Sequence, residues 1–139
     1  MLQDLWIRSA SVAILGTTLI VGTLIGCSRG PKIVPVSGKL TRNGQPVPNL
    51  EVNFLPTEGT LSVGVTDTAG QFKLGSMSHR DGAAVGTHTV FVTYNPPNEL
   101  EGASPSNLND ILAKYGSKEV SPLKIVIAKA EKDLEIKLD

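Results

Sequence analysis

The sequence predicts an all-β fold in which two sheets pack face to face as a sandwich. Seven short segments alternate apolar with polar residues, which is the pattern of a strand with one buried face. Residues that favour turns separate these segments, and the chain carries 14 glycines and 9 prolines. A strand with one apolar face needs a second layer to bury that face, so seven such strands indicate a sandwich.

The first two strands are expected at residues 36–41 and 50–54, where apolar side chains occupy alternate positions. Asn43 and Gly44 lie between them and form a dipeptide that is typical of a tight turn. We therefore assign Asn43 and Gly44 a structural role in the turn.

The next two strands are expected at residues 62–66 and 71–74, on either side of a second turn. In this turn Asp67 is expected to accept hydrogen bonds from nearby backbone amides, and Gly70 is expected to adopt a positive φ. Both residues are again assigned a structural role.

The last three strands are expected at residues 89–93, 123–128 and 134–138. His88 stands on the same face as Val90, which is an apolar face. We therefore interpret His88 as a partly buried imidazole rather than a metal ligand.

A single short helix is expected at residues 107–115, with Asn107 as its N-cap and Gly116 as the glycine that follows it. The helix lies inside a long connection, residues 95–121. Long connections in compact domains are usually functional or mobile, so we expect partners to bind on this face. The alternative is an inserted loop without a role. The helix is indicated by four apolar residues on one face, Leu108, Ile111, Leu112 and Tyr115.

The N-terminal segment has the composition of an export signal. Residues 9–25 contain no charged side chain, Arg8 precedes them, and Cys27 follows them as the only cysteine. Seventeen residues fall short of the about 20 that span a bilayer as a helix, but they suit the hydrophobic region of a signal peptide. We expect a signal peptide at residues 1–26, a tether at 27–34 and a folded domain at 35–139.

The segment LIGC, residues 24–27, resembles the lipobox of bacterial lipoproteins. The resemblance implies that the bond between Gly26 and Cys27 is cleaved and that Cys27 is lipidated at its sulfur and its new amino group. It also implies a place in the cell envelope, anchored to a membrane by lipid. Ser28 is not the aspartate that retains lipoproteins at the inner membrane, so the expectation is the outer membrane.

Four segments resemble carboxypeptidase-regulatory-like domains, in particular those of small envelope lipoproteins. The segments are VSGKLTRNGQPVP (36–48), GVTDTAGQF (64–72), DGA with GTHTVFV (81–92) and AKYG with SPLKIVI (113–127). The resemblance covers residues 36–139. It implies a transthyretin-like, seven-strand Greek-key sandwich and no defined activity.

Composition excludes several classes of function. The 13 basic and 13 acidic side chains cancel, so the chain lacks the positive charge that nucleic acids require. One cysteine cannot form an internal disulfide or a multi-cysteine metal cage. No phosphate-binding loop, dinucleotide-binding or zinc pattern occurs, so we expect no cofactor, no metal and no catalytic residue.

The strongest catalytic candidate is the cluster His79, Arg80 and Asp81, with His88 near it in sequence. Consecutive side chains in a loop diverge, whereas acid–base catalysis needs them to converge, so we interpret the cluster as a surface loop. Asp67 could bind Ca²⁺, but no further acidic residues accompany it.

We therefore expect a monomeric, lipid-anchored, non-enzymatic structural or binding module with an envelope protein or polysaccharide as its partner. The first alternative is a carbohydrate-binding accessory domain, for which Phe91, Tyr94 and Tyr115 are the candidate aromatic platforms. The second is an unrecognised hydrolase built on His79, Asp81 and His88.

Overall fold

The computed structural model describes residues 30–76, 80–98 and 106–139. These residues form an all-β fold with one short helix, as the sequence predicts. Gly26 and Cys27 lie outside the described residues. Within the described part of the chain, no helix is long and apolar enough to cross a membrane.

The larger sheet has five strands in the order β10-β9-β4-β5-β7, and all its neighbours are antiparallel. Val52 of β4 pairs with Val92 of β9, and Phe54 pairs with Val90, so apolar side chains of both strands share the inner face. The strands are β4 (Leu50–Pro56), β5 (Ser62–Val65), β7 (Gly75–Ser76), β9 (Gly86–Tyr94) and β10 (Lys124–Ile127).

The second sheet is organised around β2 (Val36–Arg42). The strand β11 (Glu131–Leu138) runs parallel to β2 along one side. On the other side β2 pairs antiparallel with β3 (Gln45–Pro46) and with β6 (Gln71–Lys73). In this sheet an early strand, β2, therefore lies beside the last strand, β11.

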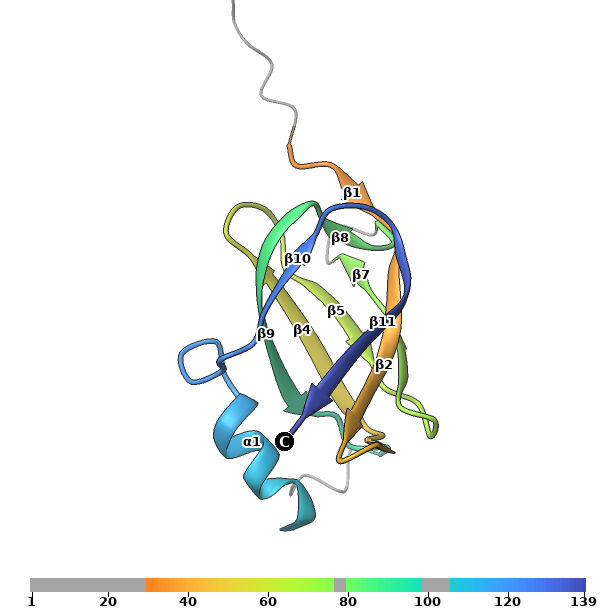
Figure 1. Ribbon diagram of the computed structural model, residues 1–139, viewed down its shortest axis with the longest axis vertical. Coiled ribbons are helices and arrows are strands. Elements are labelled where there is room, and N and C mark those ends of the chain that lie inside the picture. The colour runs from red at the N-terminus through yellow and green to blue at the C-terminus, as the bar shows by residue number, and fades with distance from the viewer. Residues whose placement is uncertain (1–29, 77–79, 99–105) are drawn as a thin grey trace, which may run out of the picture.

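A third, two-stranded sheet joins β1 (Ile33–Val34) to β8 (Ala83–Ala84). Val34 is buried and belongs to the core, so the folded part begins earlier than the boundary at residue 35 that we expected. Figure 1 shows β1 at one end of the long axis of the molecule, and helix α1 (Asn109–Tyr115) at the opposite end.

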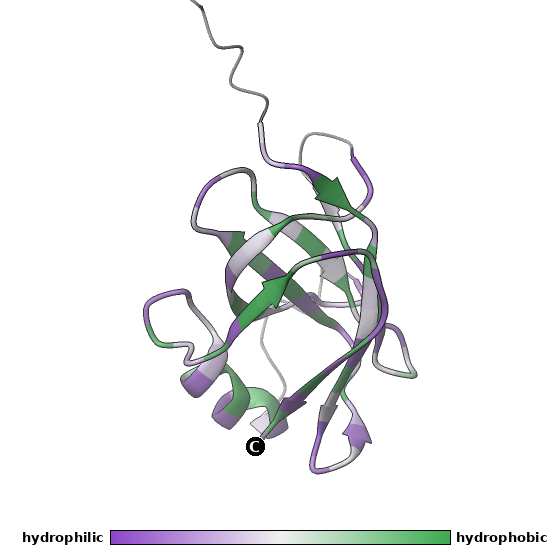
Figure 2. Ribbon diagram, turned by 45° about the horizontal axis from the view of Figure 1, so that its top comes forward, coloured by the Kyte–Doolittle hydropathy of each residue, from purple (hydrophilic) through white to green (hydrophobic). Residues whose placement is uncertain are grey.

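The core lies between the two larger sheets and consists of aliphatic side chains with the rings of Phe54, Phe72 and, from α1, Tyr115. Figure 2 shows hydrophobic and hydrophilic residues alternating along the strands, as expected for strands with one buried face.

His88 is fully buried, which corrects our interpretation of it as a partly buried residue at the edge of the core. The register of β9 places it between Pro56 of β4 and Ile125 of β10, on the inner face. Its Nε2 lies 2.7 Å from the carbonyl oxygen of Ala84, and its ring packs edge-on against Phe54. This contact makes Nε2 the protonated nitrogen, and Nδ1 has no partner among the described residues.

The two turns have the backbone geometry that their residues favour. Asn43 and Gly44 have φ values of 49° and 78°, the left-handed pair of a two-residue hairpin turn between β2 and β3. Asp67 Oδ1 accepts hydrogen bonds from the backbone N–H groups of Ala69 and Gln71, each at 2.9 Å. Gly70 has a φ of 71°.

The helix is present and Gly116 follows it as expected, but without a left-handed conformation, and the expected N-cap at Asn107 is wrong. Asn107 lies inside a 3₁₀ turn, η1 (Ser106–Leu108), and Leu108 takes the N-cap position without a side-chain hydrogen bond. Gly116 has a φ of −75°, because its N–H still bonds to the Leu112 carbonyl and continues the right-handed turn. The chain does not reverse direction there, so no left-handed residue is needed.

Candidate functional site

A cleft of about 370 Å³ opens at the end of the sandwich that carries α1. Two segments far apart in sequence form its walls, and Tyr94 lies between them at the end of β9. Its lining consists of Arg42, Gln45, Pro46, Val47, Pro48, Asn49, Tyr94, Asn107, Leu108 and Ile111.

The first wall is the segment 45–49, which the two predicted turns hold in place. The Asn43-Gly44 turn leads the chain from β2 into this segment. The Val47 N–H donates to the Leu40 carbonyl at 3.2 Å, and the Leu40 N–H donates to the Gly70 carbonyl at 2.8 Å. The turn residues thus act on the cleft indirectly, by positioning one of its walls.

Asn49 closes this wall in a left-handed conformation, with a φ of 59°. Asparagine tolerates that conformation better than other residues with a Cβ. The Asn49 N–H donates to the Thr66 carbonyl, and its own carbonyl accepts from the Asn95 N–H at 2.9 Å. These bonds connect the wall to β9, beside Tyr94.

The second wall is formed by η1 and α1, which pack on the sandwich through buried apolar side chains. Leu108, Ile111 and Tyr115 are buried, and α1 contacts β9. Beyond the helix, Ser121 is also buried, and its hydroxyl donates to the Val90 carbonyl. The chain is therefore fixed to β9 after the helix.

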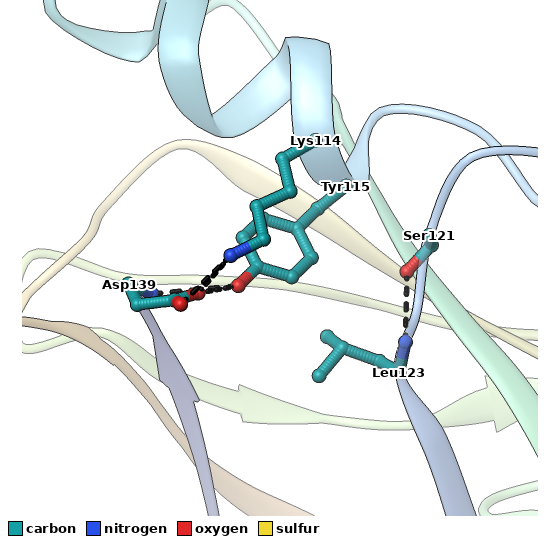
Figure 3. Close-up of polar contacts among 5 residues, drawn as sticks. All are labelled: Lys114, Tyr115, Ser121, Leu123 and Asp139. Atoms are coloured by element: carbon teal, nitrogen blue, oxygen red, sulfur yellow. Dashed lines mark hydrogen bonds and ion pairs between the residues drawn. The ribbon is translucent and has the colours of Figure 1, made fainter.

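A polar cluster attaches α1 to the end of β11 (Figure 3). The Tyr115 hydroxyl donates to Asp139 Oδ1, and Lys114 Nζ lies 2.7 Å from both carboxylate oxygens. Hydrogen bonds from Lys114 and then Tyr115 lower the pKa of the Asp139 carboxyl to about 2. The bond to Asp139 raises the pKa of Lys114.

The pKa of the Asp139 carboxyl can be measured to test whether α1 docks on the end of β11. Because it lies below the ordinary value of 3.8, the contact stabilises the docked helix fully above about pH 4 and is lost as the pH falls toward 2. An NMR titration of the Asp139 side-chain carboxyl should have its midpoint at about 2. Lys114→Met should move the midpoint back toward 3.8, whereas the control Lys118→Met should leave it unchanged. A midpoint near 3.8 in the native chain would show that the cluster does not form.

Arg42 connects the two walls. Its Nη1 donates to the Asn107 carbonyl at 3.3 Å, and its Nη2 lies 3.5 Å from the Asp110 carboxylate. Its Nε is buried without a hydrogen-bond partner among the described residues. The ion pair with Asp110 balances the one positive charge of the cleft lining.

The other polar side chains of the cleft are uncharged amides. Gln45 and Asn107 are exposed, and Asn49 is half-buried. Within the described residues none of these three amide groups forms a hydrogen bond, and neither does the Tyr94 hydroxyl. Half-buried Tyr94 packs against the core and also lines the cleft. The cleft therefore offers donors and acceptors beside an aromatic ring.

The catalytic candidates Asp81 and His88, which the structure describes, do not converge. His79 lies outside the described residues, and exposed Asp81 forms an ion pair with Lys73 at 2.8 Å. His88 is buried and contacts Ala84 instead. No group of three or more potential metal ligands (His, Cys, Asp or Glu) occurs in the described ranges.

The structure separates the three aromatic candidates. Tyr94 lines the cleft, and Tyr115, the last residue of α1, is buried against the sandwich. Phe91 lies on the face of β9 opposite to that of Tyr94. The sequence predicted the helix wall but not the wall at residues 45–49. The sequence PVPN, residues 46–49, could have indicated this wall. Its two prolines disfavour a regular strand, yet its Val47 is apolar and is buried in the structure.

No family model, no curated protein and no solved structure matches this chain in comparisons of sequence and fold.

Proposed function

We propose that this chain is a lipid-anchored, non-enzymatic binding module of the bacterial cell envelope, acting as a monomer, and that the cleft is its binding site. The lipobox-like segment that ends at Cys27 motivates the anchor. The placement of the cleft motivates the binding role.

We also propose that the fold is the seven-strand, transthyretin-like Greek key of carboxypeptidase-regulatory-like domains. Seven strands of three or more residues coincide with the seven alternating segments of the sequence: β2, β4, β5, β6, β9, β10 and β11. The other four strands have two residues each. The motifs of the resemblance correspond to β2, the Asp67–Gly70 turn, β9, and the segment from the end of α1 to β10.

The observation that carries the proposed function is the position of the cleft relative to the start of the described chain. The first strand, β1, lies at one end of the sandwich, and α1 lies at the other (Figure 1). If Cys27 carries the lipid, only a few residues separate the membrane from β1. The cleft would then face away from the membrane, where a partner in the envelope can reach it.

The proposal of a non-enzymatic role has support from the same geometry. General acid–base chemistry requires a base held beside an orienting group. Asp81 is engaged with Lys73 at the surface, whereas His88 is enclosed by the core. Among the residues that the structure describes, the lining of the cleft includes no histidine, serine, cysteine or carboxylate.

A crosslinking pull-down from the native envelope tests the proposal. The double variant Gln45→Glu/Asn107→Glu places two negative charges at the mouth of the cleft without disturbing buried residues. The control Gln71→Glu/Asn109→Glu makes the same chemical change at exposed positions outside the cleft. We expect partner capture to fall about tenfold in the first variant only. Equal capture by both variants would place the binding surface elsewhere.

A further inference from the structure

We propose that the ligand of the cleft is a neutral oligosaccharide. The inference rests on the proposed function and gives its binding site a chemical class of ligand. Four properties of the cleft support it: its charge, its free amides, its aromatic ring and the backbone of its first wall.

The described lining of the cleft is electrically balanced. Arg42 is its only charged residue among those that the structure describes, and it is paired with Asp110. An anionic ligand such as a phosphate or a uronate would have to compete with that carboxylate for the guanidinium. A cationic ligand would find no carboxylate in the described part of the lining. A neutral ligand neither competes with Asp110 for the guanidinium nor needs a carboxylate partner.

The free side-chain amides of the cleft suit a ligand that carries hydroxyl groups. A side-chain amide presents donors and an acceptor together, and a sugar hydroxyl likewise donates and accepts. The amides of Gln45 and Asn49 stand on one wall and that of Asn107 on the other. A ligand with hydroxyls on both of its edges can therefore bond to both walls at once.

Tyr94 supplies the apolar contact that a pyranose ring needs. The face of an aromatic ring carries negative charge density and attracts the weakly positive C–H groups of a sugar. Pro46 and Pro48 add apolar surface beside it. A volume of about 370 Å³ is near the lower end of the range for ligand sites, so the cleft suits one or two sugar units.

The backbone of the first wall argues against an extended peptide. A peptide that adds a strand needs a row of free N–H and C=O groups at a sheet edge. The edge strand β3 has only two residues, and Pro46 and Pro48 lack an N–H. A proline-rich peptide needs a groove lined by several aromatic rings, and Tyr94 is the only aromatic residue that lines this cleft within the described ranges.

A second depression provides a contrast. It measures about 410 Å³ and lies along β2, β6 and β11. Its described lining includes four charged side chains whose charges cancel, Lys39, Lys132, Asp133 and Glu135, so most of its polar side chains are ionic rather than amides. It lacks an exposed aromatic ring, because Phe72 there is buried. The combination of neutrality, free amides and a half-buried tyrosine belongs to the first cleft.

The test is an NMR titration of the full chain in micelles of a detergent without a sugar head group. The probes are tetrasaccharides of β-1,4-glucose, α-1,4-glucose and β-1,4-N-acetylglucosamine. The comparison probes are tetragalacturonate and a proline-rich nonapeptide. The side-chain amide signals of Gln45, Asn49 and Asn107 report on the cleft. The amide signal of Gln71 reports on the second depression.

At least one neutral tetrasaccharide should shift the three cleft amides and leave Gln71 unchanged. Tyr94→Leu keeps apolar bulk but removes the ring, and it should weaken this binding about tenfold. Tyr94→Phe keeps the ring and should stay within about threefold, a difference below about 0.7 kcal/mol.

Two results overturn the inference. One is the absence of any shift with all three neutral sugars at about 10 mM, where a ligand with a Kd of about 1 mM would be bound. The other is binding of the peptide or of tetragalacturonate in preference to the neutral sugars. In either case the envelope pull-down still decides the proposed function, because it depends on the cleft and not on the nature of the ligand.

Discussion

Replacement of Gly70 by valine is expected to lower the free energy of unfolding of the domain by about 3 kcal/mol or more. Gly70 has a φ of 71°, a conformation that a β-branched residue strongly disfavours. A Cβ at this position would also lie 2.5 Å from the Leu40 carbonyl oxygen and 3.0 Å from Pro46. Small domains are stable by only about 5–15 kcal/mol, so the loss is a large fraction of the total.

Gly44→Val is the matched control for this prediction. Gly44 also has a positive φ, of 78°, but a Cβ there would meet nothing within 4 Å. Its cost is therefore the backbone strain alone, about 1–3 kcal/mol, and the difference between the two variants measures the contact with Leu40 and Pro46. Asp67→Ala should cost less than Gly70→Val, since it removes two exposed hydrogen bonds worth about 1 kcal/mol each.

Urea unfolding of residues 28–139, followed by far-ultraviolet circular dichroism, gives the three midpoints. The expected order of destabilisation places Gly70→Val first. Equal midpoint shifts for Gly70→Val and Gly44→Val would mean that the Asp67–Gly70 turn does not press against Pro46 in solution. The first wall of the cleft would then lack the support described above.

The long strands could be predicted from the sequence because each carries its own pattern. Along β4 and β9 the alternation of apolar and polar residues is local, so it requires no knowledge of the partner strand. The short strands have no such pattern. Ala83 and Ala84 form β8 only because Ile33 and Val34 lie opposite them, and that pairing joins residues about 50 positions apart.

Some residues of the cleft could likewise be predicted from the sequence, and others could not. Tyr94 and the apolar helix face could be selected from the sequence, because an aromatic residue and a helical spacing are both local features. The wall at residues 45–49 could not, because it becomes part of a site only when β2 brings it opposite α1. Arg42 shows this most clearly, since its partners Asn107 and Asp110 are more than 60 residues away along the chain.

For His88 the sequence predicted the correct face of the strand but not how deeply the side chain is buried. Its alternation with Val90 placed it on the inner face of β9, as the structure has it. How deeply it is buried depends on its neighbours across the sheet, Pro56 and Ile125, and on Phe54. Those neighbours come from two other strands, so the sequence around His88 carries no information about them.

Replacement of Cys27 by serine is expected to abolish membrane anchoring completely. A thioether to diacylglycerol requires sulfur, so serine cannot accept the lipid. Each buried methylene contributes about 0.8 kcal/mol, and two or more acyl chains hold a protein at a membrane stably where one chain does not. The native protein should therefore fractionate with membranes, and its intact mass should show the loss of residues 1–26 and the addition of acyl groups.

The control Ser28→Ala changes the neighbouring side chain and leaves the sulfur in place, so it should remain lipidated and membrane-bound. A second control is the chain from residue 28 onward, which should be soluble and monomeric, because β1 to β11 bury their apolar faces against one another. A native protein with an unmodified, full-length mass that still fractionates with membranes would contradict the lipid anchor. Residues 9–25 would then hold the chain as an uncleaved segment, and the placement of the cleft away from the membrane would rest on that segment instead.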